Sequence, residues 1–326
     1  MSINIWMLIG FLLAAYSVMA NDSLQTLGTY LVSNRSRTPQ VAQMAFLCTV
    51  TSVVLGLGWT FHAGDPSWGR LTPFPLPTAF TWAYLIPPLA VLALTAWGAP
   101  VSTSFLVLTS FGPASIGKLL ESSLSGYLLA FLIGLLAWGL GFWLLERWVF
   151  QQPFDDQAPP PLWTVLQWCT TGLLWSVWMV QDLANIFIYL PRRLNASAMV
   201  VCTLIVCIGL CLLVTIGGGP MQRVIQSKTN STDLRSATAI DAMFGLCLLG
   251  QSLMSSFPLS TTWVFLGLLG GREIGLRSHG QSGCSPCMNG PRIQGLGNDL
   301  WKAAVGLIVS VVVALATQPM IRWAAH

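Results

Sequence analysis

The chain carries the polar segment A-N-D-S-L-Q-T at residues 20–26 and the polar segment V-Q-D-L-A-N-I at residues 180–186, each inside otherwise apolar sequence. Their acids, Asp22 and Asp182, lie 160 positions apart. Each acid has amide side chains within a few residues. The two segments therefore resemble two copies of one polar motif.

A second pair of polar segments recurs in the same order, A-P-V-S-T-S-F at residues 99–105 and F-P-L-S-T-T-W at residues 257–263. Their first hydroxyls, Ser102 and Ser260, lie 158 positions apart. Two independent motifs thus repeat with almost the same offset. This pattern predicts an internally duplicated chain in which the polar segments form the working site.

Composition predicts a membrane protein. Hydrophobic residues make up 54% of the 326 positions and charged residues 8%, whereas soluble domains carry about 25% charged residues. The mean hydropathy is +0.68. The net charge of +4 is small and spread among loops, which argues against a nucleic-acid partner. We expect a multi-pass protein in a lipid bilayer, at the cell (plasma) membrane and of the bacterial inner-membrane kind.

Apolar stretches outline the expected helices, since a bilayer core needs about 20 apolar residues as helix. Candidate spans fall at roughly 3–20, 41–60, 79–98, 124–148, 162–180, 197–216, 237–256 and 301–323. Shorter apolar stretches that begin with polar residues fall at 22–33, 102–116, 182–191 and 260–271. Short stretches that follow a local break are typical of discontinuous or re-entrant helices.

The sequence Q-Q-P-F-D-D-Q-A-P-P-P at residues 151–161 divides the chain, because its prolines disfavour helix. We expect a stiff linker outside the membrane between a first membrane repeat, residues 1–150, and a second, residues 162–326. A further irregular stretch at 277–298 is an insertion in the second half. Arginines follow corresponding motifs in both halves, so the positive-inside rule leaves the orientation open.

The eight cysteines do not predict a disulfide framework. Six of them lie in apolar runs, where cysteine usually packs as a small hydrophobe: Cys48, Cys169, Cys202, Cys207, Cys211 and Cys247. Cys284 and Cys287 have C-x-x-C spacing in a polar stretch. Neither a fourth metal ligand nor a soluble redox fold is evident around this pair, so the sequence assigns it no role.

The two duplicated acids indicate a cation site. A carboxylate inside a membrane is costly and persists when it binds something. Carboxylate and amide oxygens suit a hard monovalent cation such as Na+, and protonation of a buried carboxyl is the alternative. The candidate Na+ ligands are Asn21, Asp22, Gln25, Gln181, Asp182 and Asn185. Asp241 has no duplicate; it either lines the pathway or lies near a helix end.

The two hydroxyl-rich segments indicate an anion site. Pro100 and Pro258 each precede three hydroxyls and then an apolar stretch, as expected of a helix start. Unpaired N–H groups and the positive dipole end of such a helix bind oxyanions. No basic residue lies in either motif, so helix ends and bound cations must supply the positive potential. The candidate substrate-binding residues are Ser102, Thr103, Ser104, Ser260, Thr261 and Thr262.

These motifs resemble those of the inorganic phosphate transporter (PiT) family, which carries two G-A-N-D-V-A-N-A-F-G-T signatures and two P-V-S-T-T-H-type segments. The first signature corresponds to M-A-N-D-S-L-Q-T-L-G-T at residues 19–29 and the second to M-V-Q-D-L-A-N-I-F-I-Y at residues 179–189. The hydroxyl segments match from Pro100 and from Pro258. The resemblance spans both halves and identifies the chain as a divergent member.

The resemblance implies an all-α integral membrane protein with two inverted-topology repeats and broken or re-entrant helices. It implies symport of phosphate with Na+ or H+, and a homodimer. By position, the cation-site residues are Asn21, Asp22, Asp182 and Asn185, and the anion-site residues are Ser102, Thr103, Ser260, Thr261 and Thr262. The chain departs from the family pattern at Gln25, Gln181, Ser104, Phe105 and Trp263. These departures leave sulfate and bicarbonate open as substrates.

We therefore expect a secondary active transporter that carries out Na+-coupled symport of inorganic phosphate or a related small oxyanion, without an organic cofactor. The alternatives are sulfate or bicarbonate transport by the same fold, and H+ in place of Na+. The rival classes are an intramembrane enzyme and a non-transporting membrane scaffold. None of the three histidines lies in the middle of an expected span, which argues against histidine-based catalysis.

Overall fold

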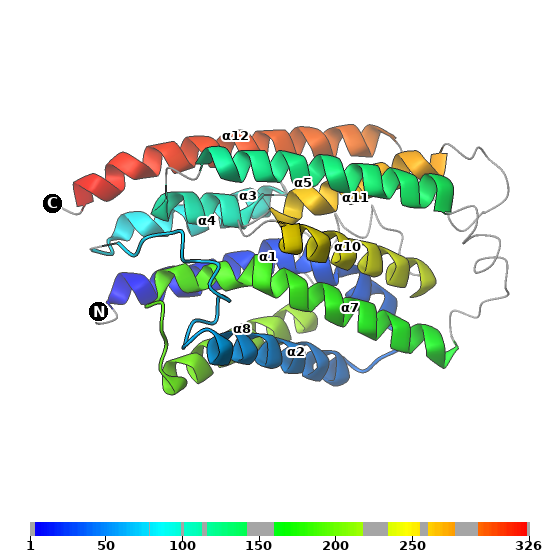
Figure 1. Ribbon diagram of the computed structural model, residues 1–326, viewed down its shortest axis with the longest axis horizontal. Helices are drawn as coiled ribbons and strands as arrows, with labels where there is room; N and C mark the ends of the chain where they lie inside the picture. Colours follow the sequence, from blue (N-terminus) through cyan, green and yellow to red (C-terminus); the bar gives the residue numbers. More distant parts are fainter. Residues whose placement is uncertain are drawn as a thin grey trace.

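The computed structural model describes residues 4–77, 79–98, 101–112, 116–141, 160–217, 234–254, 260–277 and 293–324, and over these residues the regular structure is helical (Figure 1). The first half comprises α1 (Ile5–Asn34), α2 (Gln40–Phe61), the 3-10 turn η1 (Trp82–Leu85), α3 (Ile86–Trp97), α4 (Thr103–Phe111), α5 (Ile116–Leu136) and the π-helical turn η3 (Ala137–Gly141). The second half comprises α7 (Pro161–Gln181), the 3-10 segment η5 (Leu183–Tyr189), α8 (Ala196–Ile216), α10 (Leu234–Met254), α11 (Thr261–Arg277) and α12 (Ile293–Ala324).

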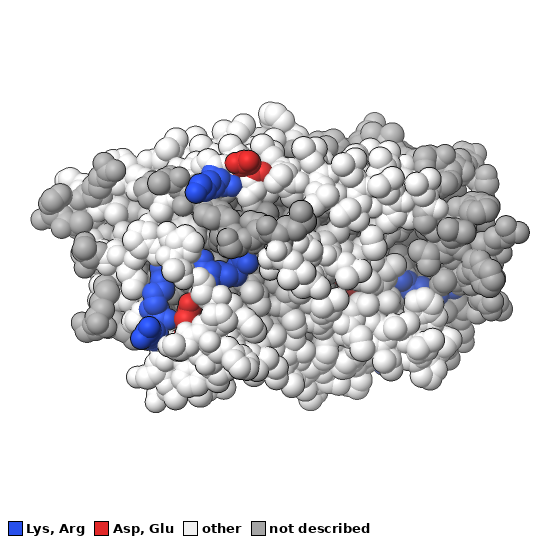
Figure 2. Space-filling model, viewed as in Figure 1, with Lys and Arg blue, Asp and Glu red and all other residues white. Residues whose placement is uncertain are grey.

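Six of the described helices are long and apolar enough to cross a membrane: Ile5–Ser23, Gln40–Phe61, Ile116–Leu140, Ala196–Ile216, Leu234–Leu253 and Ala304–Ile321. Large apolar side chains such as Leu128 and Leu204 are exposed on them. Figure 2 shows a described surface that is almost free of charge on this face. An uncharged apolar exterior is what a lipid solvent requires, so the predicted class, an all-helical membrane protein, is confirmed.

Helix α1 lies at the centre of the bundle, where it contacts helices of both halves. Its polar residues from Ser17 to Asn34 are buried. Around it, Trp175 and Trp178 of α7 are fully buried and stack with ring centroids 4.7 Å apart. The duplicated polar motif of α1 is therefore held in the interior of the protein, away from lipid.

Corresponding helices of the two halves run in opposite directions. In Figure 1, α1 and α5 run from left to right, whereas α7 and α12 run from right to left. Helix α2 packs on α8, α4 packs on α12, and α11 packs on α5. The short helix α4 of the first half thus packs on α12, at the end of the second half, and α11 of the second half packs on α5, near the end of the first half. This course favours inverted repeats, and the repeat boundaries stay a prediction.

Two glycines allow the backbones of α5 and α11 to come into contact. A Cβ atom at Gly267 would overlap the backbone carbonyl of Tyr127, and one at Gly271 would overlap that of Phe131. Small residues four positions apart permit this close packing between membrane helices. The contact fixes the position of α11, whose first residues carry the second hydroxyl segment.

The structure corrects several expected boundaries. The separate segment expected at 22–33 is wrong, because α1 continues unbroken from Ile5 to Asn34. The Thr26 hydroxyl bonds the carbonyl of Ser23 at 2.9 Å within the same helix. An unbroken helix also pairs the backbone N–H and C=O groups of its interior with one another, so that none of them needs water as a partner.

Residues 79–98 do not form one spanning helix but η1 and the 12-residue α3. Pro87 and Pro88 explain this, because proline is tolerated only in the first turn of a helix. Helix α5 begins at Ile116, before the expected 124. Helix α12 begins at Ile293, so the end of the expected irregular stretch 277–298 is helical. In the linker, Pro160 caps α7; residues 151–159 lie outside the described residues, as do Cys284 and Cys287.

The six cysteines expected to be unpaired are free thiols. Cys202 and Cys247 are buried, and the Cys48 and Cys211 sulfurs lie 3.8 Å apart between α2 and α8. Burial as small hydrophobes is seen for Cys202 and Cys247, whereas Cys48, Cys207 and Cys211 are half-buried and Cys169 is exposed.

Candidate functional site

Helix α7 ends at the second polar motif. Asp182 leaves helical geometry with φ −118° and ψ −51°, and the 3-10 segment η5 follows. The Asn185 side chain donates to the Gln181 carbonyl at 3.0 Å, which satisfies a backbone acceptor released by the break. The predicted discontinuous helix is therefore present in the second half, and it places Asp182 at a helix end.

The first polar motif lies in the middle of α1, so Asp22 reaches the site from an unbroken helix. Asn21 donates to the Asp22 carboxylate at 2.8 Å and to the Val101 carbonyl at 2.6 Å. Val101 immediately precedes the α4 start, where the Ser102 hydroxyl accepts from the Phe105 N–H at 3.2 Å. Asn21 thus joins the acid of α1 to the start of α4, and Ser102 acts as the cap of that helix.

Hydroxyls from both halves bind the Asp22 carboxylate. The Thr103 hydroxyl, at the first residue of α4, donates to one carboxylate oxygen. The Thr262 hydroxyl, in the first turn of α11, lies 3.2 Å from the other carboxylate oxygen and 3.1 Å from the Val101 carbonyl. The acid of the first motif therefore connects the two hydroxyl segments directly.

The Asp182 carboxylate is bound in the same way. The Ser104 hydroxyl of α4 donates to one oxygen and the Thr261 hydroxyl of α11 donates to the other. Asn185 donates to the Ser104 oxygen at 2.6 Å. Each acid thus accepts one hydroxyl from its own half and one from the opposite half.

The sequence offsets relate these four bonds in pairs. The Thr103–Asp22 bond corresponds to the Thr261–Asp182 bond, and the Thr262–Asp22 bond corresponds to the Ser104–Asp182 bond. The site is therefore a two-fold network of two carboxylates and four hydroxyls. The sequence predicted a cation site and an anion site as separate groups, whereas the structure joins their residues in one hydrogen-bonded cluster.

This cluster is closed in the described conformation. Asp22 is 0% exposed and Asp182 is 2% exposed. The space beside it is a narrow gap lined by Ala14, Val18, Thr103, Ser104, Val107, Asn185 and Ile186. The Trp263 ring packs edge-on against Tyr127 of α5, with ring centroids 5.9 Å apart. An anion could reach the hydroxyls only after the cluster opens.

Several buried oxygen atoms at the site have no hydrogen-bond partner. They are Asn21 Oδ1, Gln25 Oε1, Asn185 Oδ1 and Ser260 Oγ. Leaving such groups unpaired costs about 1–3 kcal/mol each. Amide and carboxylate oxygens are the ligands that a hard cation prefers. These residues therefore fit Na+, which would satisfy oxygens that the protein itself leaves without a donor.

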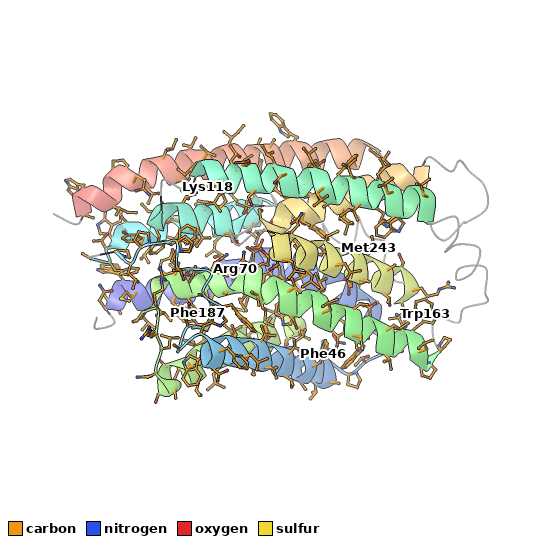
Figure 3. The ribbon with its side chains drawn as sticks, in the orientation of Figure 1. Phe46, Arg70, Lys118, Trp163, Phe187 and Met243 are labelled. Atoms are coloured by element: carbon orange, nitrogen blue, oxygen red, sulfur yellow. The ribbon has the colours of Figure 1, made fainter. Side chains whose placement is uncertain are left out.

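One basic side chain reaches the site, contrary to the expectation that helix ends and bound cations alone supply the positive potential. Arg70 lies between α2 and η1, and its guanidinium donates to Gln181 Oε1 at 3.2 Å. It also interacts electrostatically with the Asp182 carboxylate. Figure 3 shows Arg70 at mid-length in the bundle. Its position in an irregular stretch, far from both motifs in sequence, gave no signal for this role.

Asp241 forms a second buried acidic cluster. It lies two turns into α10 and is 1% exposed. It accepts from Thr29 of α1, from Thr171 at 2.7 Å and from Gln167 at 2.9 Å, both of α7. Thr29 is seven residues beyond Asp22, about 10 Å along the helix axis. Asp241 therefore links three helices at a place separate from the two-acid cluster, and not at a helix end.

The structure brings together Asn21, Asp22, Gln181, Asp182, Asn185, Ser102, Thr103, Ser104, Thr261 and Thr262 through the bonds above. Gln25 and Ser260 are also buried, and their side-chain polar atoms have no hydrogen-bond partner among the described residues. Pro100 and Pro258 lie outside the described residues. The roles of all these side chains in cation and anion binding stay predictions.

Fold and site together define an all-helical membrane protein in which each half contributes an acid and a hydroxyl-bearing helix start to one buried cluster. A solved structure described as the sodium-dependent phosphate transporter has the same fold, with a TM-score of 0.64 over 98% of this chain and 97% of that chain. Sequence identity is 16%, so the likeness is one of fold. No protein-family model and no curated protein matches the chain. The resemblance seen in the motifs is confirmed at the level of the fold.

Proposed function

We propose that the protein is a secondary transporter that moves a small inorganic oxyanion, phosphate in the first instance, together with Na+. One observation carries this proposal: each of two buried carboxylates accepts a hydroxyl from each of two helix starts. The sodium-dependent phosphate transporter of the same fold supports the choice of ions. A scaffold has no need of two facing acids inside a membrane.

Proton accounting links the two ions. A serine or threonine hydroxyl has a single hydrogen to donate. In the closed cluster, the hydroxyls of Thr103, Ser104 and Thr261 donate it to carboxylates, and the Thr262 hydroxyl has both the Asp22 carboxylate and the Val101 carbonyl as acceptors. They cannot donate to an oxyanion at the same time. An oxyanion must therefore take the hydroxyls from the carboxylates before it can bind.

Na+ at the carboxylates makes that exchange favourable. Bound Na+ replaces the hydroxyl hydrogens as the positive partner of a carboxylate, and an unpaired amide oxygen beside that carboxylate contributes to its ligands. The released hydroxyls and the first N–H groups of α4 and α11 then face the anion. The same cations offset the repulsion between the carboxylates and the incoming anion. Na+ therefore binds before the anion.

Opening of the cluster provides alternating access. Two of the four hydroxyl bonds, Thr262–Asp22 and Ser104–Asp182, join opposite halves of the protein. Movement of one half against the other would break these two bonds together and expose the site to one side. The predicted homodimer is not required for this step and stays a prediction from the resemblance.

Uptake into proteoliposomes tests the proposal. Purified protein is reconstituted, and entry of radiolabelled phosphate, sulfate and bicarbonate is measured under an inward Na+ gradient, under a pH gradient and under neither. We expect Na+-driven phosphate uptake that the Asp22→Asn and Asp182→Asn variants lose. Uptake driven only by the pH gradient would replace Na+ by H+ in the proposal. No uptake of any anion under either gradient would refute transport and favour a scaffold.

A further inference from the structure

The segment of residues 62–77, between α2 and η1, packs over the end of α7. Its Leu71 and Phe74 are buried. Two bonds attach it to the stretch after η5: the Leu194 N–H donates to the Gly64 carbonyl at 2.9 Å, and Arg192 donates to the Phe74 carbonyl at 2.8 Å. Gly64 has a φ of +95°, which an L side chain rarely adopts. Arg70 is therefore delivered to the interior by a segment with a defined fold.

Arg70 makes the two halves of the site unequal. In the second half, Gln181 Oε1 accepts the Arg70 guanidinium at 3.2 Å, while Gln181 Nε2 donates to the Leu248 carbonyl of α10 at 3.0 Å. The residue at the corresponding position in the first half is Asn21, whose Oδ1 is buried without a partner. The Gln181 amide oxygen is thus already engaged beside Asp182, whereas its counterpart, Asn21 Oδ1, is open beside Asp22.

We propose that Arg70 is a built-in counter-cation for the Asp182 half of the site, so that transport of each oxyanion requires one bound Na+, held by Asp22, Asn21 and Gln25. This inference rests on the proposed function and specifies its stoichiometry. Arg70 acts as a positioning residue: it holds Gln181 and supplies a fixed positive charge near Asp182. Asn185 Oδ1 remains free on that side and belongs to the anion-facing hydroxyl cluster through Ser104.

The charge count supports the assignment. Two buried carboxylates need two positive charges before an anion can enter without strong repulsion. A guanidinium stays protonated in proteins, so Arg70 contributes one of these charges permanently. One Na+ then completes neutrality. Without the guanidinium, a second Na+ must bind at Asp182.

The Na+ dependence of phosphate uptake tests the proposal. Initial rates are measured in proteoliposomes across Na+ concentrations for the parent, for Arg70→Gln and for the charge-retaining Arg70→Lys. We expect a Hill slope of about one for the parent and Arg70→Lys, and a slope rising toward about two for Arg70→Gln, because the slope is limited by the number of coupled sites. Arg193→Gln, an exposed arginine on the adjoining stretch, is the matched control and keeps the parental slope.

The double variant Arg70→Gln/Asp182→Asn removes both charges together. It keeps the charge balance of the parent, so it tests the proposal even if Arg70→Gln alone does not fold. Because uptake is expected to be lost with Asp182, Na+ binding to this variant is followed by thermal stabilisation in detergent, and we expect a single Na+ site, as in the parent. A parental slope near two, or an unchanged slope in Arg70→Gln with weaker phosphate affinity, would overturn the counter-cation role and assign Arg70 to the anion. Absence of any anion uptake by the parent would instead refute the proposed function.

Discussion

Replacing Thr103 with valine removes one hydroxyl from the Asp22 carboxylate with little change in side-chain size. Thr103 is 1% exposed and begins α4. Thr109 is the matched control, because it lies on the same helix, is 0% exposed, and its hydroxyl donates to the Phe105 and Leu106 carbonyls of its own helix. The two Thr→Val changes therefore differ in whether a carboxylate loses a donor.

The expected magnitude follows from the partners. A hydrogen bond to a charged group contributes about 1.5–3 kcal/mol, so Thr103→Val should lower the free energy of unfolding by that amount in the absence of ligands. Thr109→Val should cost less than about 1 kcal/mol, because a hydroxyl bonded back to its own helix adds little. At saturating Na+ the Thr103 hydroxyl is released toward the anion. Its loss should then weaken phosphate binding by about 10- to 150-fold.

Both quantities can be measured in detergent solution. Denaturant unfolding followed by tryptophan fluorescence gives the change in stability, and calorimetric titration of phosphate at saturating Na+ gives the affinity. The reasoning predicts that Thr103→Val changes both readouts while Thr109→Val changes neither strongly. If the two variants give equal changes in stability and in phosphate affinity, the hydroxyl of Thr103 is not shared between the carboxylate and the anion.

Two further predictions concern the supporting structure. Gly271→Ala should destabilise the protein by about 1–3 kcal/mol, because the new Cβ would overlap the Phe131 backbone. The Cβ of Gly270→Ala would meet the Phe131 ring at an ordinary 3.5 Å, so this variant should be tolerated. Thermal unfolding in detergent distinguishes the two variants, and equal melting temperatures would contradict the close-packing argument. Asp241→Asn should cost about 1–3 kcal/mol of stability, because an amide cannot accept from all three donors. The Na+ dependence of phosphate uptake should stay parental in this variant. A changed Na+ dependence would place Asp241 in the coupling site.

Most residues of the candidate site could be predicted from the sequence, because the polar motifs that contain them occur twice. The offset between the two copies identified Asp22 and Asp182, and the helix starts at Thr103 and Thr261 follow from hydroxyls placed before apolar stretches. The pattern gave the residues but not their partners. Nothing in the spacing shows that each acid accepts hydroxyls from both halves, because that depends on how the two halves pack.

The two copies of the acidic motif differ in a way that explains the wrong expectation for α1. Asn185 has a short side chain that bonds the Gln181 carbonyl, and the helix breaks there. The position equivalent to Asn185 in the first copy is Gln25, whose side chain is one methylene longer and whose amide atoms have no hydrogen-bond partner among the described residues. Asparagine competes for nearby backbone groups more readily than glutamine does. The helix therefore breaks in the second copy only, although a break was expected in both copies.

Other features differ in how visible they were. The glycines of α11, at Gly267, Gly271 and Gly275, have a four-residue spacing that could have predicted close packing with another helix. Arg70 had no such signal. It lies in an irregular segment with neither helical nor strand periodicity, and only the fold of residues 62–77 brings it beside Gln181.

The central claim is that the hydroxyls of α4 and α11 are exchanged between carboxylates and anion, which makes Na+ and phosphate binding mutually dependent. Calorimetric titration of phosphate into the purified protein over a series of Na+ concentrations tests it most directly. The account predicts that phosphate affinity rises with Na+ and that phosphate raises Na+ affinity by the same factor, as linkage requires. A phosphate affinity that is the same with and without Na+ would contradict it.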